Sequence, residues 1–374
     1  MILPLSKRIF GLDVIRTIAI SLVVISHASI LIFPKSEHIV LTVIKTFGSI
    51  GVDLFFVLSG FLIGGILLKL IEENKVKYNY LFNFWIRRWF RTLPNYYLIL
   101  LLNIVILLLF HESLPKNLSS YFLFLQNFSS PHPDFFTESW SLSVEEYAYL
   151  ILPFALYFCL SFLKNMNKTK LFFYVTLILM LVFFSLKLIY FKNVTINSYA
   201  EWSASFRKVV IYRMDTIYIG FLLIYFMKNY LKFFKKYKST IALAGVLLFL
   251  SLHIIIYIFN LTPKSHLLFY VFIYLQLVHL SLAMLFPYLY HLNYRGLFLK
   301  PIEFISVHSY SIYLINYSIV LLNIQKLFHI ESFSHYQKTG IVFLFLIITL
   351  FFSIILYKFF ELPILRYRDR NFKR

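Results

Sequence analysis

The sequence has few charged residues and almost no cysteine, and both shortages exclude classes of protein. Only 14% of its 374 residues are charged, whereas 60% are hydrophobic. One or two soluble domains could not keep so much apolar surface away from water, so we expect a membrane protein. The single cysteine, Cys159, excludes a disulfide framework and any cysteine-based metal site.

Acidic residues are scarce as well. The chain has 16 Asp and Glu against 36 Lys and Arg, which gives a formal net charge of +20. Such an excess is typical of nucleic-acid-binding proteins only when the basic residues gather on one soluble face. Here they are dispersed between apolar stretches. The expected partner is therefore the lipid bilayer and not a nucleic acid.

Apolar stretches close to bilayer-spanning length recur along the whole chain. They lie at residues 9–33, 52–71, 94–110, 143–163, 171–190, 209–227, 240–259, 267–290, 302–328 and 339–360. The sequence therefore predicts an all-α integral membrane protein, a bundle of about ten transmembrane helices.

The chain lacks a long polar segment. The longest loop, residues 111–139, is too short to bury a core of its own, so we expect residues 1–374 to form one membrane-embedded domain with no appended soluble domain. The first apolar stretch carries Asp13 and Arg16 and is too long for a cleaved signal segment, so we expect it to be retained. No internal repeat is evident, which weakens a secondary-transporter interpretation.

The distribution of basic residues predicts the orientation. With ten spans, 24 Lys and Arg lie on the side of the two termini and ten on the other side. Positive residues favour the cytoplasmic side of short loops. Both termini are therefore predicted to be cytoplasmic.

The first span holds three ionisable residues. Such residues are costly inside a membrane, so each indicates a partner, a cavity or a function. Arg16 and His27 are eleven residues apart, so they share one helix face at about 16 Å along the axis. Asp13 lies one turn before Arg16 and can pair with it. The structural alternative is a snorkelling Arg–Asp pair and a hydrogen-bonded buried histidine.

Acidic residues near the outer ends of two other spans favour a site. Asp53 begins the second predicted span, and Glu145 and Glu146 begin the fourth, so all three are predicted to lie at the depth of His27. A histidine beside carboxylates is suited to taking a proton from a hydroxyl. Alternatively, these residues are half-solvated interfacial anchors. Neither a GxSxG nor an HExxH motif occurs, so hydrolase and zinc chemistry are poorly supported.

Three arginines precede the third predicted span. Arg87, Arg88 and Arg91 stand just before Pro94, with Arg87 and Arg91 one helical turn apart. Guanidinium groups in such a cluster hold phosphates well. Topology anchors and contacts with lipid phosphates produce the same pattern, so this alternative remains open.

Taken in order, these motifs resemble those of the membrane-bound acyltransferase 3 family, the integral-membrane O-acyltransferases of bacterial surface glycans. The strong matches are Arg16-x10-His27, GVDLFFVLSGFLI from Gly51, RRxxRxxP from Arg87 and WSLSVEE from Trp140. Weaker matches are RMDTIYIG from Arg213, SYSIYLINYS from Ser309, and FELP near the end of the last span. The resemblance covers the chain nearly end to end.

The resemblance implies a multi-pass enzyme of the bacterial cytoplasmic membrane. It would move an acetyl group from cytoplasmic acetyl-CoA to a hydroxyl of an extracytoplasmic or lipid-linked glycan such as O-antigen, capsule or exopolysaccharide, without a metal. The implied catalytic residues are His27, Arg16, Glu145 and Asp53, and the implied donor-binding residues are Arg87, Arg88, Arg91 and Arg16. The sequence departs from the family pattern at Tyr147 and Ala148, and at Asn316 and Ser318, where the family commonly has His and Pro.

Several alternatives remain open from the sequence. A carrier of lipid-linked sugars or small anions would also need charges within the membrane, although it would not need the arginine cluster. A sensory or scaffold protein would need neither the charges within the membrane nor the arginine cluster. The sequence does not distinguish acetyl from longer acyl donors, nor direct transfer from an acyl-histidine intermediate.

Overall fold

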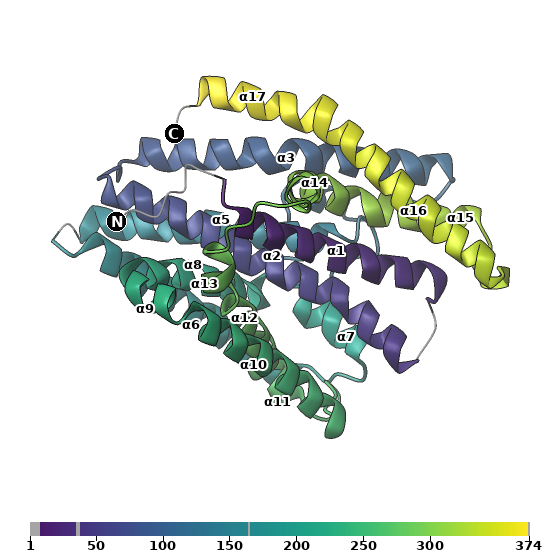
Figure 1. Cartoon of the computed structure of the whole chain (residues 1–374), viewed down its shortest axis with the longest axis horizontal. Helices are drawn as coiled ribbons and strands as arrows, with labels where there is room; N and C mark the ends of the chain where they lie inside the picture. Colours follow the sequence, from purple (N-terminus) through teal and green to yellow (C-terminus); the bar gives the residue numbers. More distant parts are fainter. Residues whose placement is uncertain (1–7, 35–37, 164, 373–374) are drawn as a thin grey trace.

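A computed structural model describes residues 8–34, 38–163 and 165–372. The described residues form helices and connecting loops and contain no strands, as the sequence predicts (Figure 1). The main helices are α1 (Phe10–Ile32), α2 (Ile39–Glu72), α3 (Tyr78–Leu109), α5 (Ser139–Phe162), α6 (Lys168–Asn193), α8 (Met214–Asn229), α10 (Lys238–Ile258), α12 (Leu275–Ala283), α14 (Leu299–Ile315), α16 (His335–Ile355) and α17 (Leu362–Asn371). The short helices are α4 (Leu118–Phe122), α7 (Tyr199–Trp202), α9 (Leu231–Lys236), α11 (Leu267–Phe269), α13 (Phe286–Tyr290) and α15 (Leu322–Leu327).

Within these described ranges, nine helical segments are long and apolar enough to cross a membrane. They match nine of the ten predicted spans. The remaining prediction, residues 209–227, corresponds to α8, whose 16 residues give a length of about 24 Å. The prediction of an all-α membrane bundle is therefore confirmed.

Two helices begin much earlier than predicted, and this changes the depth of the residues they carry. Helix α2 begins at Ile39 and not at Val52, because the apolar stretch before Gly51 continues the same helix. Helix α3 begins at Tyr78 and runs through Pro94, which was predicted to lie at its start. Its first turns pack against α5 and α17, which offsets the hydrogen bond that proline removes.

Helices α1 and α2 form a closely packed antiparallel pair in the middle of the bundle. Ser26 donates a hydrogen bond to the carbonyl oxygen of Lys45 (2.7 Å). Gly51 allows the backbones to approach, since a Cβ there would lie 2.4 Å from the carbonyl oxygen of Ala19. This register places Asp53 about eight residues, or about 12 Å, below His27 along the pair.

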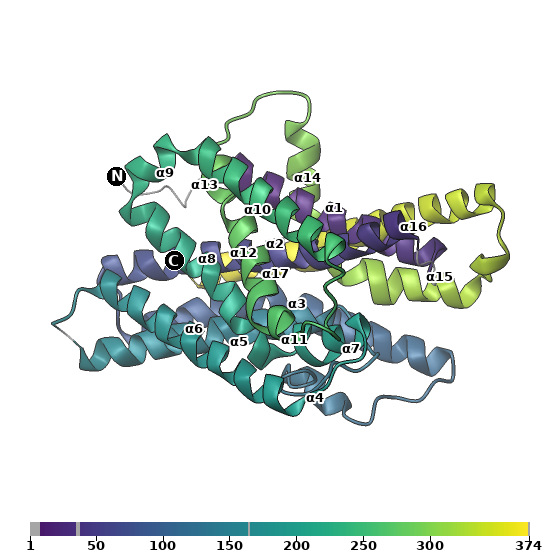
Figure 2. The same ribbon diagram turned by 90° about the horizontal axis from the view of Figure 1, so that it is seen from below.

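The remaining helices surround this pair. Helix α8 packs along α2, and α14 packs along α1. Helices α16 and α17 cover one side of the bundle beyond α3, while α6, α10 and α12 cover the opposite side (Figures 1 and 2). Helix α14 leads into a π-helical turn, Asn316–Leu321, and then into α15. Such turns occur frequently at functional sites.

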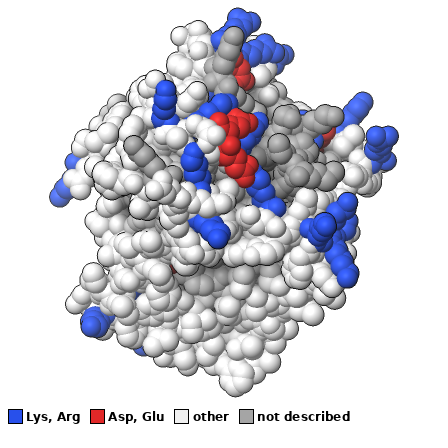
Figure 3. Space-filling view, turned by 90° about the vertical axis from the view of Figure 1, so that its left-hand side faces the viewer, with Lys and Arg blue, Asp and Glu red and all other residues white. Residues whose placement is uncertain are grey.

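One end of the bundle is rich in basic side chains. Helix α1 begins and α17 ends toward this end, where the loop between α2 and α3 also lies (Figure 1). Figure 3 views this end and shows many Lys and Arg side chains around a small group of acidic ones. We call it the basic end. It is the end that the positive-inside rule predicts to be cytoplasmic.

Candidate active site

His27 lies near the far end of α1 and is held by Asn316. Its Nδ1 atom is hydrogen-bonded to the Oδ1 atom of Asn316, and its ring packs against Tyr317 with centroids 4.7 Å apart. The amide nitrogen of Asn316 donates to the carbonyl oxygens of Ile312 (2.7 Å) and Tyr313 (2.9 Å). The amide orientation is thereby fixed, so Oδ1 faces His27 as an acceptor. Nδ1 must then carry the proton, which leaves Nε2 with a free lone pair.

Asp53 does not lie beside His27, contrary to the prediction. Its carboxylate forms an ion pair with Arg213 and lies 3.6 Å from Nε2 of His279. The early start of α2 carries Asp53 well below the depth of His27. Close by, Lys187 and Asp215 form another buried pair (2.6 Å). These residues tie α2, α6, α8 and α12 together in the interior.

Glu145 also differs from its predicted position. It accepts hydrogen bonds from Arg88 (3.2 Å), Ser59 (3.0 Å) and Tyr149 (3.0 Å), so it belongs with the arginine cluster. Because α5 begins at Ser139, Glu145 lies nearly two turns inside the helix. The predicted convergence of Glu145 with His27 at one outer level is therefore wrong.

Glu146 is likewise directed toward α3, where its Oε1 accepts a hydrogen bond from Thr92 (2.8 Å). Both acidic residues of the WSLSVEE motif therefore contact the segment that carries the RRxxRxxP motif. The contact joins α5 to α3 on the side of the bundle toward the basic end.

The three clustered arginines have different surroundings. Arg87 donates to Asp369 (2.8 Å) and to the carbonyl oxygen of Phe372, so it ties α3 to α17. Arg88 is partly buried against Glu145 and lies over the ring of Tyr149, with Cζ 4.2 Å from the centroid. Arg91 is exposed and, among the described residues, has no hydrogen-bond or ion-pair partner. It is therefore the arginine best placed to take a ligand.

A cavity of about 470 Å³ brings most of the predicted site residues together. Its lining includes Arg16, Arg87, Arg88, Arg91 and Glu145, and also Arg368, which the sequence analysis missed. Along α2 the lining runs from Val52 to Glu73, a length of about 31 Å. The cavity is cationic toward the basic end and mainly apolar at its deep end. Such a shape suits a long ligand with phosphates at one end.

Arg16 lines this cavity and is held by Asp13. Its Nη1 atom lies 3.3 Å from the carboxylate of Asp13, which also accepts from Arg8 (2.7 Å) and Ser306 (2.6 Å). The predicted Asp13–Arg16 pair is confirmed. Arg16 therefore stands on the cavity wall on the same helix as His27.

Tyr313 links the cavity lining to the partner of His27, because its carbonyl oxygen accepts a hydrogen bond from Asn316. Its side chain lines the deep end, and its hydroxyl donates to the carbonyl oxygen of Glu138 (3.1 Å) and lies 2.7 Å from Oγ of Ser141. Asn316 follows one turn later on the same helix. His27 is not among the residues that line the cavity. A ligand that reaches the histidine must therefore extend beyond the residues that line the cavity.

Glu138, in the loop before α5, is a buried acidic residue that the sequence analysis missed. Its Oε1 atom accepts a hydrogen bond from Oγ of Ser318 (2.5 Å), within the same π-helical turn as Asn316. Burial raises the pKa of Glu138 to about 7. The side chain braces the turn that carries the partner of His27.

The fold and cavity define a membrane protein with an arginine-lined cavity between its helices, and comparison with known proteins identifies its class. The family model described as an acyltransferase domain matches residues 9–358. The chain therefore belongs to this family of acyltransferases, as its motifs predict.

Two relatives illustrate the similarity. The chain is 38% identical over 141 residues to the peptidoglycan O-acetyltransferase OatA of Listeria monocytogenes serovar 1/2a, which is 33% of this chain and 22% of that protein. It is 30% identical over 145 residues to the O-acetyltransferase OatA of Staphylococcus aureus strain NCTC 8325, which is 35% of this chain and 24% of that protein. The matched part thus spans less than a quarter of the length of these relatives. No solved structure matches the chain.

Proposed function

We propose that the protein moves an acetyl group from cytoplasmic acetyl-CoA to a hydroxyl of a cell-surface glycan on the other side of the membrane. The observation that carries the proposal is the hydrogen bond between Nδ1 of His27 and Oδ1 of Asn316. With Nδ1 as the donor to this oxygen, Nε2 would accept a proton or an acyl group.

The donor would occupy the arginine-lined cavity from the basic end. Its phosphates would be held by Arg91 and its neighbours, through charge-assisted hydrogen bonds that guanidinium groups make well. The pantetheine arm would extend along α2 toward Tyr313. Displacement of the Tyr313 side chain would then let the thioester reach His27.

The chemistry needs one proton carrier. In direct transfer, Nε2 of His27 takes the hydroxyl proton while the hydroxyl oxygen attacks the thioester carbonyl. The carbon–sulfur bond then breaks, and the thiolate takes the proton back from the imidazolium. In the two-step alternative, Nε2 itself attacks the thioester carbonyl, and the carbon–sulfur bond breaks to release the CoA thiolate. The hydroxyl oxygen then attacks the acetyl carbon, the bond between that carbon and Nε2 breaks, and the hydroxyl proton passes to the thiolate.

The acceptor class is supported by the relatives. The Listeria relative is named for peptidoglycan, so peptidoglycan joins O-antigen, capsule and exopolysaccharide as glycans that carry suitable hydroxyls. The acceptor would approach His27 from the end of the bundle opposite the basic end, because His27 lies only five residues before the end of α1.

Thermal unfolding of the purified protein tests donor binding. A ligand present at 100 times its Kd stabilises the folded state by about 2.7 kcal/mol, so acetyl-CoA should raise the Tm. Arg91→Ala should weaken this effect without lowering the Tm of the free protein, since Arg91 has no hydrogen bond or ion pair with any described residue. Arg295→Gln removes an exposed loop charge that lines neither cavity, and serves as the matched control.

Absence of any acetyl-CoA effect on the parent protein would contradict the proposal. It would favour instead a carrier of lipid-linked sugars or small anions.

A further inference from the structure

A second cavity, of about 270 Å³, adjoins the first toward the basic end. Its lining comes from α1, α3, α14 and α17 and from the π-helical turn Leu356–Glu361. Arg16, Arg91 and Arg368 line both cavities and form the wall between them. Arg8 lines only the second.

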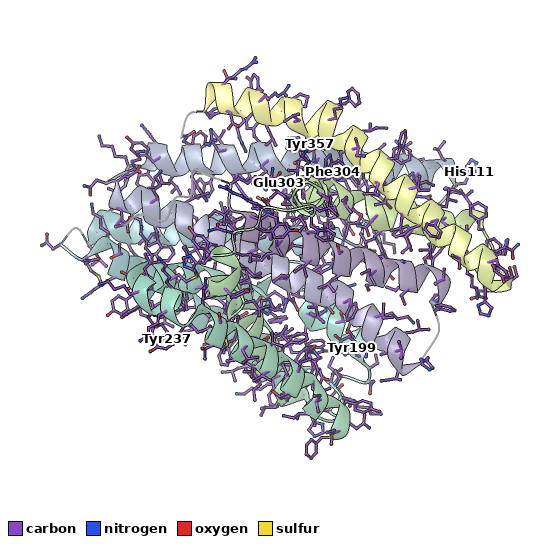
Figure 4. All side chains as sticks on the ribbon, in the orientation of Figure 1. His111, Tyr199, Tyr237, Glu303, Phe304 and Tyr357 are labelled. Carbon is purple, nitrogen blue, oxygen red and sulfur yellow. The ribbon has the colours of Figure 1, made fainter. Side chains whose placement is uncertain are left out.

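The surroundings of this cavity are closely packed. Nη2 of Arg8 donates to the carbonyl oxygen of Glu303 on α14 (3.0 Å). The ring of His308 on the same helix meets the ring of Tyr357 edge to face, with centroids 4.7 Å apart. Figure 4 labels Glu303 and Tyr357 in this region, where α14 lies beside the last helical segment. The cavity is thus a defined hollow between helices.

Arginines outnumber carboxylates in the lining of this cavity, four to two (Asp13 and Glu361), and two more carboxylates lie beside it. Arg8 also pairs with Glu303 (3.8 Å), and Arg368 pairs with Asp369 (2.9 Å). The Glu361 carboxylate is already occupied, because its Oε2 atom accepts from Asn95 (2.9 Å) and Ser311 (2.7 Å). The Asp13 carboxylate likewise forms ion pairs with Arg8 and Arg16 and accepts a hydrogen bond from Ser306.

Arg91 is left without a protein partner among the described residues, although it lies within a membrane-spanning helix. An unpaired charge in that position is costly unless a ligand or water meets it. The other three lining arginines, Arg8, Arg16 and Arg368, each have a carboxylate partner. A phosphate group would supply Arg91 with the anionic oxygen acceptors that it lacks among the described residues.

We propose that the second cavity binds a phosphate group. The inference rests on the proposed function in one respect: a CoA donor carries a diphosphate and a separate ribose phosphate, and the shared arginine wall lets one lie in each cavity. The headgroup of an anionic phospholipid offers the same chemistry. The experiment therefore has one arm for each source.

The donor arm compares acetyl-CoA with acetyl-3′-dephospho-CoA on the purified protein in neutral detergent. Arg8→Gln should weaken acetyl-CoA binding about tenfold and leave the affinity for the dephospho analogue unchanged. Arg8→Lys should largely restore acetyl-CoA affinity, because it retains the charge. Arg295→Gln should change neither affinity.

The lipid arm measures the Tm in nanodiscs of phosphatidylcholine with and without phosphatidylglycerol. Stabilisation by phosphatidylglycerol that is lost in Arg8→Gln but kept in Arg8→Lys would support the cavity with a lipid as its source. If Arg8→Gln has no selective effect in either arm, the inference is overturned. If acetyl-CoA fails to bind even the parent protein, the proposed function is contradicted. The lipid arm then still tests whether the second cavity binds a phosphate group.

Discussion

The Oδ1 atom of Asn316 accepts a hydrogen bond from Nδ1 of His27, and both amide hydrogens of Asn316 are used by backbone carbonyls of its own helix. An amide in this arrangement has only an acceptor to offer the imidazole. The amide can therefore fix the orientation and tautomer of the imidazole, as a carboxylate does for many catalytic histidines, without placing a charge in the membrane.

Asn316→Leu should remove the acceptor while keeping a side chain of similar size. The imidazole would then be free to take either tautomer, so we expect turnover to fall about 10²-fold with acetyl-CoA affinity unchanged. Asn316→Asp retains an acceptor oxygen and should keep more activity than Asn316→Leu. Equal activity of the leucine variant and the parent, measured as acetyl transfer by purified protein, would contradict this role.

Glu145 should act through Arg88 and not through His27. Removing one partner of a buried ion pair costs about 3 to 5 kcal/mol, because the other charge is left unpaired. Arg88→Ala should therefore lower the Tm strongly, and the added change Glu145→Gln should recover part of the loss. A double-mutant cycle on the free energy of unfolding should give a coupling of about 1 to 3 kcal/mol. Additive effects would show that the contact contributes nothing.

Asp53 should matter for folding and not for chemistry. Its carboxylate neutralises Arg213 in the protein interior, so Asp53→Ala should destabilise the fold by about 3 to 5 kcal/mol. Turnover per folded molecule should remain within about twofold of the parent, since Asp53 lies about 12 Å below His27. Unchanged stability together with a large loss of turnover would return Asp53 to the active site.

Glu138 should make stability depend on pH. Its pKa is about 7 in the folded protein against an ordinary value of 4.5, so the folded state holds the proton over that interval. The stabilising contribution is present below about pH 4.5 and is lost as the pH rises through 7. Glu138→Gln should flatten the Tm between pH 5 and 8, whereas Asp134→Asn, an exposed change in the same loop, should not. A Glu138→Gln profile identical to that of the parent would exclude this role.

The fold was largely predictable from the sequence because apolar length and basic-residue distribution are decisive in a membrane. Depth within the bundle was harder to predict. The sequence places Asp53 at the outer end of its helix because hydropathy does not locate a helix start when apolar residues precede it, as they do before Gly51. For Glu145, hydropathy does not show the contacts with Ser59 and Arg88 that assign it to the arginine cluster.

The contacts between side chains of different helices could not be predicted from the sequence either. Asn316 stood out only as a departure from the family pattern, and nothing in the residues around Glu138 or Arg368 marked them as neighbours of the site. Their positions depend on how α14 and α17 pack against α1 and α3, which is settled by long-range contacts.

The central claim is that His27 performs the transfer, and His27→Gln tests it most directly. Glutamine can still hydrogen-bond with Asn316, but it cannot take and return a proton near neutral pH. The arginines proposed to hold the donor phosphates line the cavity, which His27 does not line, so the variant should still bind acetyl-CoA. Mass spectrometry of the surface glycan should find acetylation abolished in cells that carry His27→Gln in place of the parent chain. Acetylation at the parent level in those cells would contradict the account.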